Sequence, residues 1–210
     1  QTRLTHEDYL RNTPLRERSP WAAHPDFSIF RHMWDDMHLL YLGFGRDLGG
    51  SVLIELAEEG VWGDGIMNDR LKRAHLAFKT WAEIHKCNCT VPCFTLSNLG
   101  RGNSSKVFPE LDSQIKAAST KLVLAWLCDI CVQTTDEYSE EAAKIRCLTV
   151  WSLASYMDLL GRSGQWLTDE VAEKACHHGK TFLLCYGCLA NMACSAKKCH
   201  YKPRPKLHFW

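Results

Sequence analysis

The sequence contains no apolar run of the roughly 18 to 20 residues that a membrane-spanning helix requires. It also lacks an excess of charge, since 25 Lys and Arg residues nearly balance 24 Asp and Glu residues and leave a formal net charge of +1. This balance excludes a uniformly basic nucleic-acid-binding chain and an acidic tail, but it allows a local charged patch. Internal repeats, low-complexity tracts and clear strand patterns are missing as well. We therefore expect neither a membrane protein nor a repeat array.

What is present is a helical pattern with an ordinary globular composition, 46% apolar and 23% charged residues. Apolar residues recur at helical spacing in five segments, which predict helices at 36–60, 68–85, 109–134, 139–161 and 168–196. Pro109 suits the first turn of the third helix. We predict a mainly α fold of about five helices in one bundle-like domain at 31–196, between an irregular lead-in at 1–30 and a basic tail at 197–210.

The first predicted helix combines an apolar stripe with an unusual number of glycines. The stripe repeats every four residues: Leu40, Phe44, Leu48, Val52 and Leu56. Four glycines in the same segment (Gly43, Gly45, Gly49 and Gly50) would each cost a helix about 1 kcal/mol relative to alanine. Such a cost indicates either a break in the helix or the close approach of another backbone.

Eleven cysteines are a high and odd number for 210 residues. Several lie in apolar helical segments, which favours free, mostly buried thiols in a reducing compartment over disulfides. Three groups have spacings that a metal site could use. They are Cys185, Cys188, Cys194, Cys199 and His200 as a zinc site, the pair Cys128 and Cys131, and the loop cluster of Cys87, Cys89 and Cys93 with His85. For each group, chance clustering in a cysteine-rich chain, with buried thiols at Cys128 and Cys131, is the preferred explanation.

A carboxylate and an imidazole stand three residues apart in Asp35-Asp36-Met37-His38, just before the first apolar stripe. If the first helical turn is formed, Asp35 and His38 lie on one side of it. Such a pair could bind a divalent metal, act as an acid–base pair, or hold a DNA phosphate beside a metal site. The simpler alternative is a capping aspartate next to a surface histidine.

The segment Asp-x-Met-His followed by an apolar, glycine-rich helix resembles the corresponding segment of CACTA-type and related cut-and-paste DNA transposases. Weaker similarity runs from Phe108-Pro109-Glu110-Leu111 through the later helices to Lys202-Pro203-Arg204-Pro205-Lys206-Leu207-His208. The resemblance implies the helical insertion of a ribonuclease-H-like core. It also implies that Asp35 and His38 lie near the active site and the DNA end, without being among the three metal-binding acids.

By the same resemblance, two catalytic aspartates would lie upstream of Gln1 and the third acid beyond Trp210, so we expect the chain to be part of a longer protein. Mg²⁺ or Mn²⁺ would serve the intact parent, and this chain alone would not cut DNA. The predicted partners are DNA and the rest of the parent polypeptide, in the nucleus. The DNA backbone would be contacted by Lys197, Lys198, Lys202, Arg204 and Lys206. The alternative is an intracellular, non-catalytic helical interaction module, with or without a Cys/His zinc site.

Overall fold

The structure is a computed structural model that describes residues 7, 11–12, 14, 37–102, 104–164 and 167–204. Contacts divide the chain into two units, residues 1–36 and 37–210. In the first unit, Glu7, Arg11 and Asn12 have helical backbone and exposed side chains. Most of the predicted lead-in at 1–30 falls outside the described residues.

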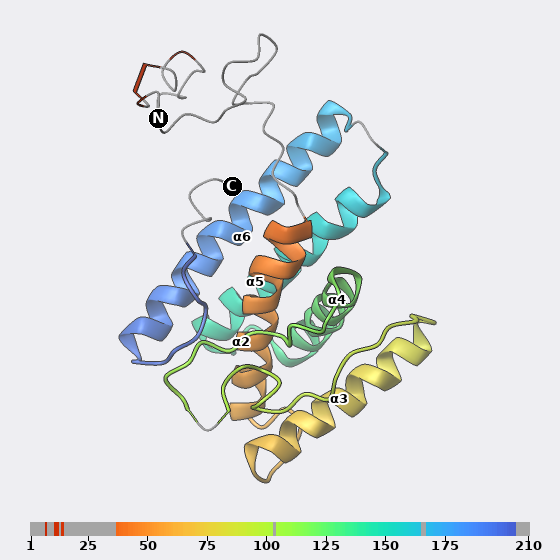
Figure 1. Cartoon of the computed structure of the whole chain (residues 1–210), viewed down its shortest axis with the longest axis vertical. Helices are drawn as coiled ribbons and strands as arrows, with labels where there is room; N and C mark the ends of the chain where they lie inside the picture. The colour runs from red at the N-terminus through yellow and green to blue at the C-terminus, as the bar shows by residue number, and fades with distance from the viewer. Residues whose placement is uncertain are drawn as a thin grey trace. The chain divides into compact units, whose positions relative to one another are not determined.

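The second unit is built from helices, and the described residues contain no β-strand (Figure 1). A short π-helix, η4, leads directly into the first α-helix. The elements in chain order are η4 (Met37–Phe44), α2 (Gly45–Glu58), α3 (Met67–Ile84), α4 (Ala117–Thr134), α5 (Glu141–Arg162) and α6 (Asp169–Ser195). The mainly α prediction is therefore confirmed. The side chain of Thr168 caps α6 by accepting a hydrogen bond from the backbone N–H of Val171.

Four of the five predicted helices are close to the observed ones, but the third begins at Ala117 and not at Pro109. Residues 109–111 instead form an extended connection that is tied to other parts of the fold. The backbone N–H of Glu110 donates to the Leu99 carbonyl at 3.1 Å, and that of Leu111 donates to the Arg46 carbonyl at 3.0 Å. These bonds hold residues 110 and 111 against residues 99 and 46, in a connection that precedes α4.

The glycines of α2 allow this connection to cross the helix at short range. A Cβ atom placed on Gly50 would lie 2.6 Å from the backbone N and Cα of Glu110, and one on Gly49 would lie 2.8 Å from the Leu111 side chain. Both distances are too short for real contacts. Close backbone packing, one of the two explanations predicted for these glycines, is therefore confirmed for Gly50, whereas Gly49 leaves room for the side chain of Leu111.

The core forms around α2, whose apolar stripe is fully buried. Phe44 packs against Phe182 and Tyr186 of α6, and Trp126 of α4 stacks on Trp62 with a centroid separation of 5.9 Å. Three large apolar residues of the helices are exposed: Ile84 at 72%, and Leu148 and Trp151 at 42% each. No described helix is both long enough and apolar enough to span a membrane.

Candidate functional site on the acidic face of α2

A polar stripe runs along α2 on a different face from its apolar stripe. Asp47, Ser51, Glu55 and Glu59 follow one another at intervals of four residues, so they lie above one another on one side of the helix. Asp47 and Ser51 are completely buried. Buried polar groups need partners, and the partners come from the C-terminal part of the chain and from α5.

Residues 197–204 lie along this stripe in the direction opposite to α2. Lys198 Nζ contacts Glu58 Oε2 at 2.8 Å near the end of α2, and Arg204 binds Asp47 near its start. Between them, the backbone N–H of Tyr201 donates to Ser51 Oγ at 2.9 Å. The described part of the predicted basic tail is therefore packed against the domain, because its cations and aromatic residues complement the acidic face.

Glu55 lies at the centre of this arrangement. Its carboxylate accepts hydrogen bonds from the Tyr201 hydroxyl and from Arg146 Nη1 at 3.3 Å, and it is 3.1 Å from His200 Nδ1. Burial raises the pKa of Glu55, but the hydrogen bonds from His200 and Tyr201 and the charge of Arg146 outweigh it and lower the pKa below its usual value. Glu55 is thus held as a carboxylate that joins α2, α5 and the C-terminal segment.

Arg146 brings a buried cation from α5 to the same place. Its side chain is 3% exposed and forms a bidentate pair with Glu59, at 2.6 and 2.7 Å. Burial lowers the pKa of Arg146, yet the bonds with Glu59 raise it overall, so the guanidinium remains charged. A pocket of about 470 Å³ opens beside this pair and is bounded by Glu140, Leu189 and Tyr201, among other residues.

Asp47 forms the other end of the site. Its side chain is fully buried, and Arg204 holds both carboxylate oxygens, with Nη2 2.7 Å from Oδ1. Nη2 of Arg204 also lies 3.3 Å from Glu110 Oε2, on the connection that crosses Gly50. Burial raises the pKa of Asp47, and the Arg204 guanidinium offsets this effect only in part. The pair fastens the end of the described chain to the start of α2.

The sequence-predicted site residues are only partly described. Asp35 and Lys206 lie outside the described residues, so the structure does not test the proximity of Asp35 to His38. His38 is exposed in the first turn of η4. Lys197 is exposed with a backbone φ of 56°, and the carbonyl of the half-buried Lys202 accepts a hydrogen bond from Tyr186 at 3.0 Å.

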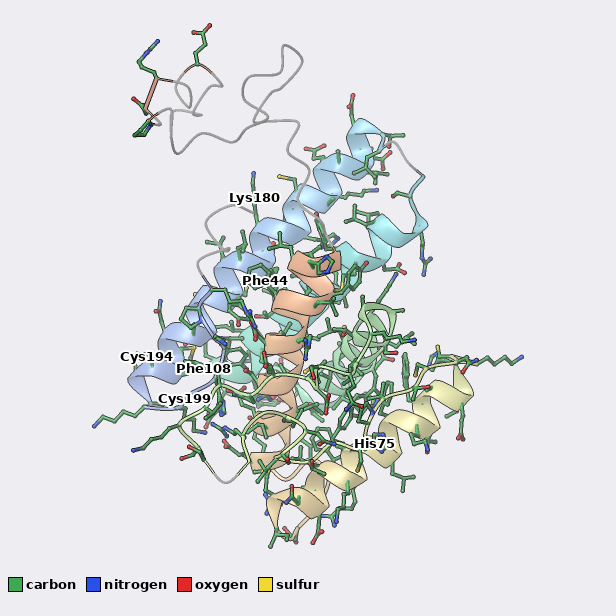
Figure 2. All side chains as sticks on the ribbon, viewed as in Figure 1. Phe44, His75, Phe108, Lys180, Cys194 and Cys199 are labelled. Carbon is green, nitrogen blue, oxygen red and sulfur yellow. The ribbon has the colours of Figure 1, made fainter. Side chains whose placement is uncertain are left out.

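The five predicted zinc ligands extend over several turns of α6 and into the residues after it. Cys194 and Cys199 lie at the C-terminal end of the helix (Figure 2), whereas Cys185 and Cys188 belong to earlier turns. His200 is buried, with Nδ1 on Glu55 and with Nε2 lacking a hydrogen-bond partner. Within the described ranges, no group of three or more His, Cys, Asp or Glu side chains is arranged to hold a metal ion.

All eleven cysteines are free thiols. Cys147 of α5 lies close enough to Cys128 and Cys131 of α4 to raise the pKa of both thiols, and Cys128 also raises the pKa of Cys131. Burial raises the pKa of Cys128 to about 11 and that of Cys131 to about 12, so both remain protonated thiols at neutral pH. The expectation of buried thiols is confirmed for Cys131, whereas Cys188 is exposed.

The sequence analysis did not predict a role for the polar stripe of α2, for Arg146 or for the residues that bind them. The signal was present as four polar residues at four-residue intervals inside an otherwise apolar helix, a pattern that requires buried partners. The sequence predicts that the cations of residues 197–204 contact DNA. Two of them, Lys198 and Arg204, are instead bound to carboxylates of the domain.

Comparisons with known proteins identify no family for this chain. Searches against protein-family models, curated proteins and solved structures each found no match to the chain.

Proposed function

We propose that this chain is a helical module derived from a cut-and-paste DNA transposase, and that it positions DNA beside a catalytic core formed by other parts of the parent polypeptide. Two things support the proposal: the resemblance around Asp35-x-Met37-His38 and the way in which the described domain begins and ends. In this role the module has no catalytic activity of its own and acts in the nucleus.

The observation that carries the proposal is the closeness of the chain's entry and exit. Asp47 lies in the first turn of α2, directly after η4, and Arg204 is the last described residue. Their side chains form a bidentate pair, so the last described residue is held beside the first turn of α2, which follows the short helix η4 at the beginning of the unit. This contact supports the proposal, because a domain whose two ends lie in the same region is suited to insertion into a host fold.

The described residues do not fit the metal centre of such an enzyme. Two-metal phosphoryl chemistry needs several carboxylates around ions that are about 3.5–4 Å apart. Here the carboxylates of Asp47, which is buried, and of Glu55, which is half-buried, are bound to Arg204, Arg146, His200 and Tyr201, and no described group of side chains could hold an ion. We therefore assign no cleavage step to this chain, and Mg²⁺ or Mn²⁺ would belong to the parent core.

The proposal predicts DNA binding that depends on salt and on the C-terminal lysines other than Lys198. The triple variant Lys197→Ala/Lys202→Ala/Lys206→Ala should bind duplex DNA more weakly and lower the slope of log affinity against log salt by about 2 to 3, since each lost phosphate contact removes about 0.9. Fluorescence anisotropy with a labelled duplex at 50 to 200 mM salt measures both quantities. Lys198 and Arg204 are left unchanged because they hold the fold together.

A matched control removes three exposed lysines from other parts of the domain, Lys106, Lys116 and Lys180. This variant has the same net charge as the first, and its salt slope should stay close to that of the unmodified chain. Equal slopes for the two variants would remove the assigned role of residues 197–206. Absence of any salt-dependent binding by the unmodified chain would leave a non-catalytic interaction module.

The reading frame that flanks this sequence gives an independent test of origin. We expect two aspartates at the ends of apolar strand patterns upstream and an acidic residue in a helical or strand pattern downstream. Translation of the genomic sequence on both sides shows whether they are there. Flanks that encode no such residues would contradict derivation from a transposase, whatever the DNA-binding result.

A further inference from the structure

The N-terminus of α4 is an uncapped helix end. Lys116 precedes the helix with extended backbone, at φ −69° and ψ 155°, and its side chain does not cap the first turn. The first helical hydrogen bond runs from the Thr120 N–H to the Lys116 carbonyl at 2.9 Å. The N–H groups of residues 117–119 come before this bond and have no hydrogen-bond partner among the residues that the structure describes.

A pocket of about 470 Å³ lies against this helix end. Part of its lining comes from the start of α4 and the residues before it, and part comes from the segment that follows α3. The lining within the described chain contains one cation and no carboxylate. Its members are Asn88, Cys89, Thr90, Pro92, Gln114, Lys116, Ala118 and Ser119.

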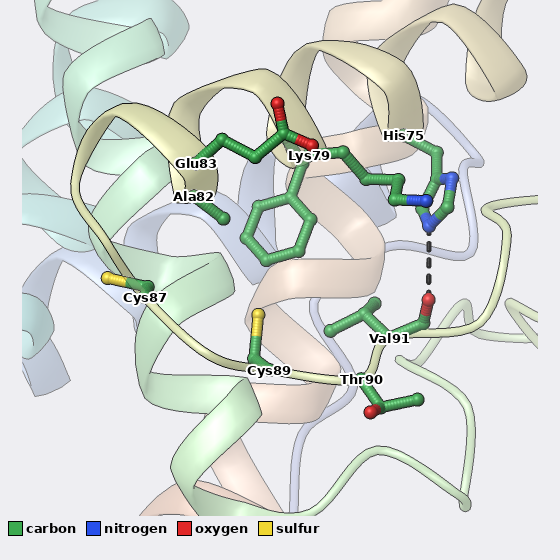
Figure 3. A pocket seen from close by; sticks show the side chains of 9 residues that line it. His75, Lys79, Ala82, Glu83, Cys87, Cys89, Thr90 and Val91 are labelled. Atoms are coloured by element: carbon green, nitrogen blue, oxygen red, sulfur yellow. Dashed lines mark hydrogen bonds between the residues drawn. The ribbon is translucent and has the colours of Figure 1, made fainter.

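The segment that follows α3 is held in place by a contact with that helix. Lys86, with a φ of 53°, reverses the chain after α3, and residues 87–95 have no regular secondary structure. His75 of α3 fastens the segment, since its Nε2 lies 3.0 Å from the Val91 carbonyl (Figure 3). In Figure 3 the sulfur of Cys89 points toward α3, whereas the side chain of Thr90 points away from it. Thr90 is therefore free to line a pocket on the other side of the segment.

Ser119 is the residue that points to a ligand in this pocket. It is 7% exposed and belongs to the pocket lining. Its hydroxyl makes no hydrogen bond to any described residue, whereas the hydroxyl of the neighbouring Thr120 donates to the Lys116 carbonyl at 3.4 Å. Because a buried polar group without a partner costs free energy, a molecule that enters the pocket and bonds to Ser119 is stabilised there.

We propose that the pocket at the start of α4 binds a phosphate group. The Ser119 hydroxyl and the N–H groups of residues 117–119 are its hydrogen-bond donors, and Lys116 supplies the positive charge. This site is separate from the α2 face and independent of the proposed function.

The donors of the pocket select an oxyanion. The N-terminus of a helix carries a partial positive charge, and its free N–H groups point outward, so it favours a negatively charged ligand. The Thr90 hydroxyl and the Asn88 amide add further donors for the several oxygens of a phosphate. A metal cation is a poor fit, since the described lining offers a lysine and no carboxylate.

The size of the pocket favours a small phosphate compound. Its volume lies within the range of about 300 to 1,000 Å³ that is typical of small-molecule sites, so an ester has room beside its phosphate group. A phosphate of duplex DNA is not expected to reach Ser119, which is almost fully buried. The ligand is therefore free phosphate or a small phosphate monoester.

Titration of the full chain with inorganic phosphate tests the site. Calorimetry gives the dissociation constant, and NMR of the backbone amides should show the largest shifts at residues 117–119. Ser119→Ala should weaken binding about tenfold or more, since a hydrogen bond to a charged group contributes this much. Lys116→Gln should weaken it about two- to fivefold, because the exposed ammonium group is screened by solvent.

A matched control removes the same two side-chain groups from an exposed loop. Ser105→Ala/Lys106→Gln should bind phosphate as tightly as the unmodified chain, whereas Ser119→Ala/Lys116→Gln should show the combined loss. Glycerol phosphate separates the two sources of the anion. Tighter binding of this ester than of inorganic phosphate would identify an ester as the ligand, and equal or weaker binding would identify free phosphate.

The amide shifts of the unmodified chain keep the proposal testable even if a variant fails to fold. Phosphate-induced shifts that leave residues 88–90 and 117–119 unaffected would overturn the site. An unchanged dissociation constant in Ser119→Ala would overturn it as well, as would displacement of bound phosphate by duplex DNA.

Discussion

Arg204→Met should lower the free energy of unfolding by about 3–5 kcal/mol at pH 7, because it leaves the fully buried Asp47 carboxylate without its counter-ion. The loss should shrink as the pH falls from 7 towards 5. Burial already raises the pKa of Asp47, and removal of the guanidinium raises it further, so acid neutralises the stranded charge in the folded variant. Urea unfolding at both pH values measures the difference from the unmodified chain.

Arg162→Met is the matched control, since it breaks an Arg–Asp pair of similar length on the surface. Arg162 and Asp158 are 80% and 48% exposed and 2.8 Å apart, whereas Arg204 and Asp47 are 28% and 0% exposed. The control should cost less than about 1 kcal/mol at either pH. Adding Asp47→Asn to Arg204→Met should recover part of the loss. Equal effects of the two single variants would show that residues 197–204 are not fastened to α2 as described.

The helices could be predicted from the sequence because their apolar residues keep a regular spacing over several turns. The end of α3 and the starts of α5 and α6 likewise depend on residues that are close to them in the sequence, such as Thr168, which caps α6. The observed start of α4 could not be predicted, since the residues next to Pro109 pack against other segments, and Leu111 is bonded to Arg46, 65 residues away. Pro109 is compatible with a helix start, but local compatibility does not decide which distant partner a backbone group finds.

The candidate site shows the same limit in its charged residues. The α2 stripe of Asp47, Ser51, Glu55 and Glu59 indicates buried partners, yet nothing local identifies Arg146 or Arg204 as those partners. Pairing of opposite charges across 87 to 157 residues is a property of the folded chain. A run of basic residues near a terminus is therefore ambiguous between a surface for phosphates and a set of internal counter-ions, and for Lys198 and Arg204 the structure shows the second.

Gly50→Ala should lower the free energy of unfolding by about 2–3 kcal/mol, although alanine is the better helix former. The new Cβ would lie 2.6 Å from the N and Cα of Glu110 and 2.8 Å from its carbonyl carbon, and backbone atoms cannot move aside as a flexible side chain can. Displacement of this connection would also weaken the hydrogen bond from Leu111 to Arg46 and the contact of Glu110 with Arg204. Thermal and urea unfolding measure the loss.

Gly187→Ala separates the effect of packing from the effect of helix propensity. Gly187 also lies within a long helix, α6, but a Cβ atom placed on it meets nothing within 4 Å. This variant should therefore be more stable than the unmodified chain by up to about 1 kcal/mol, opposite in sign to Gly50→Ala. Stabilisation by both substitutions would show that the 109–111 connection does not cross α2 at Gly50, and the packing that brings Glu110 to Arg204 and Asp47 would then have to be different.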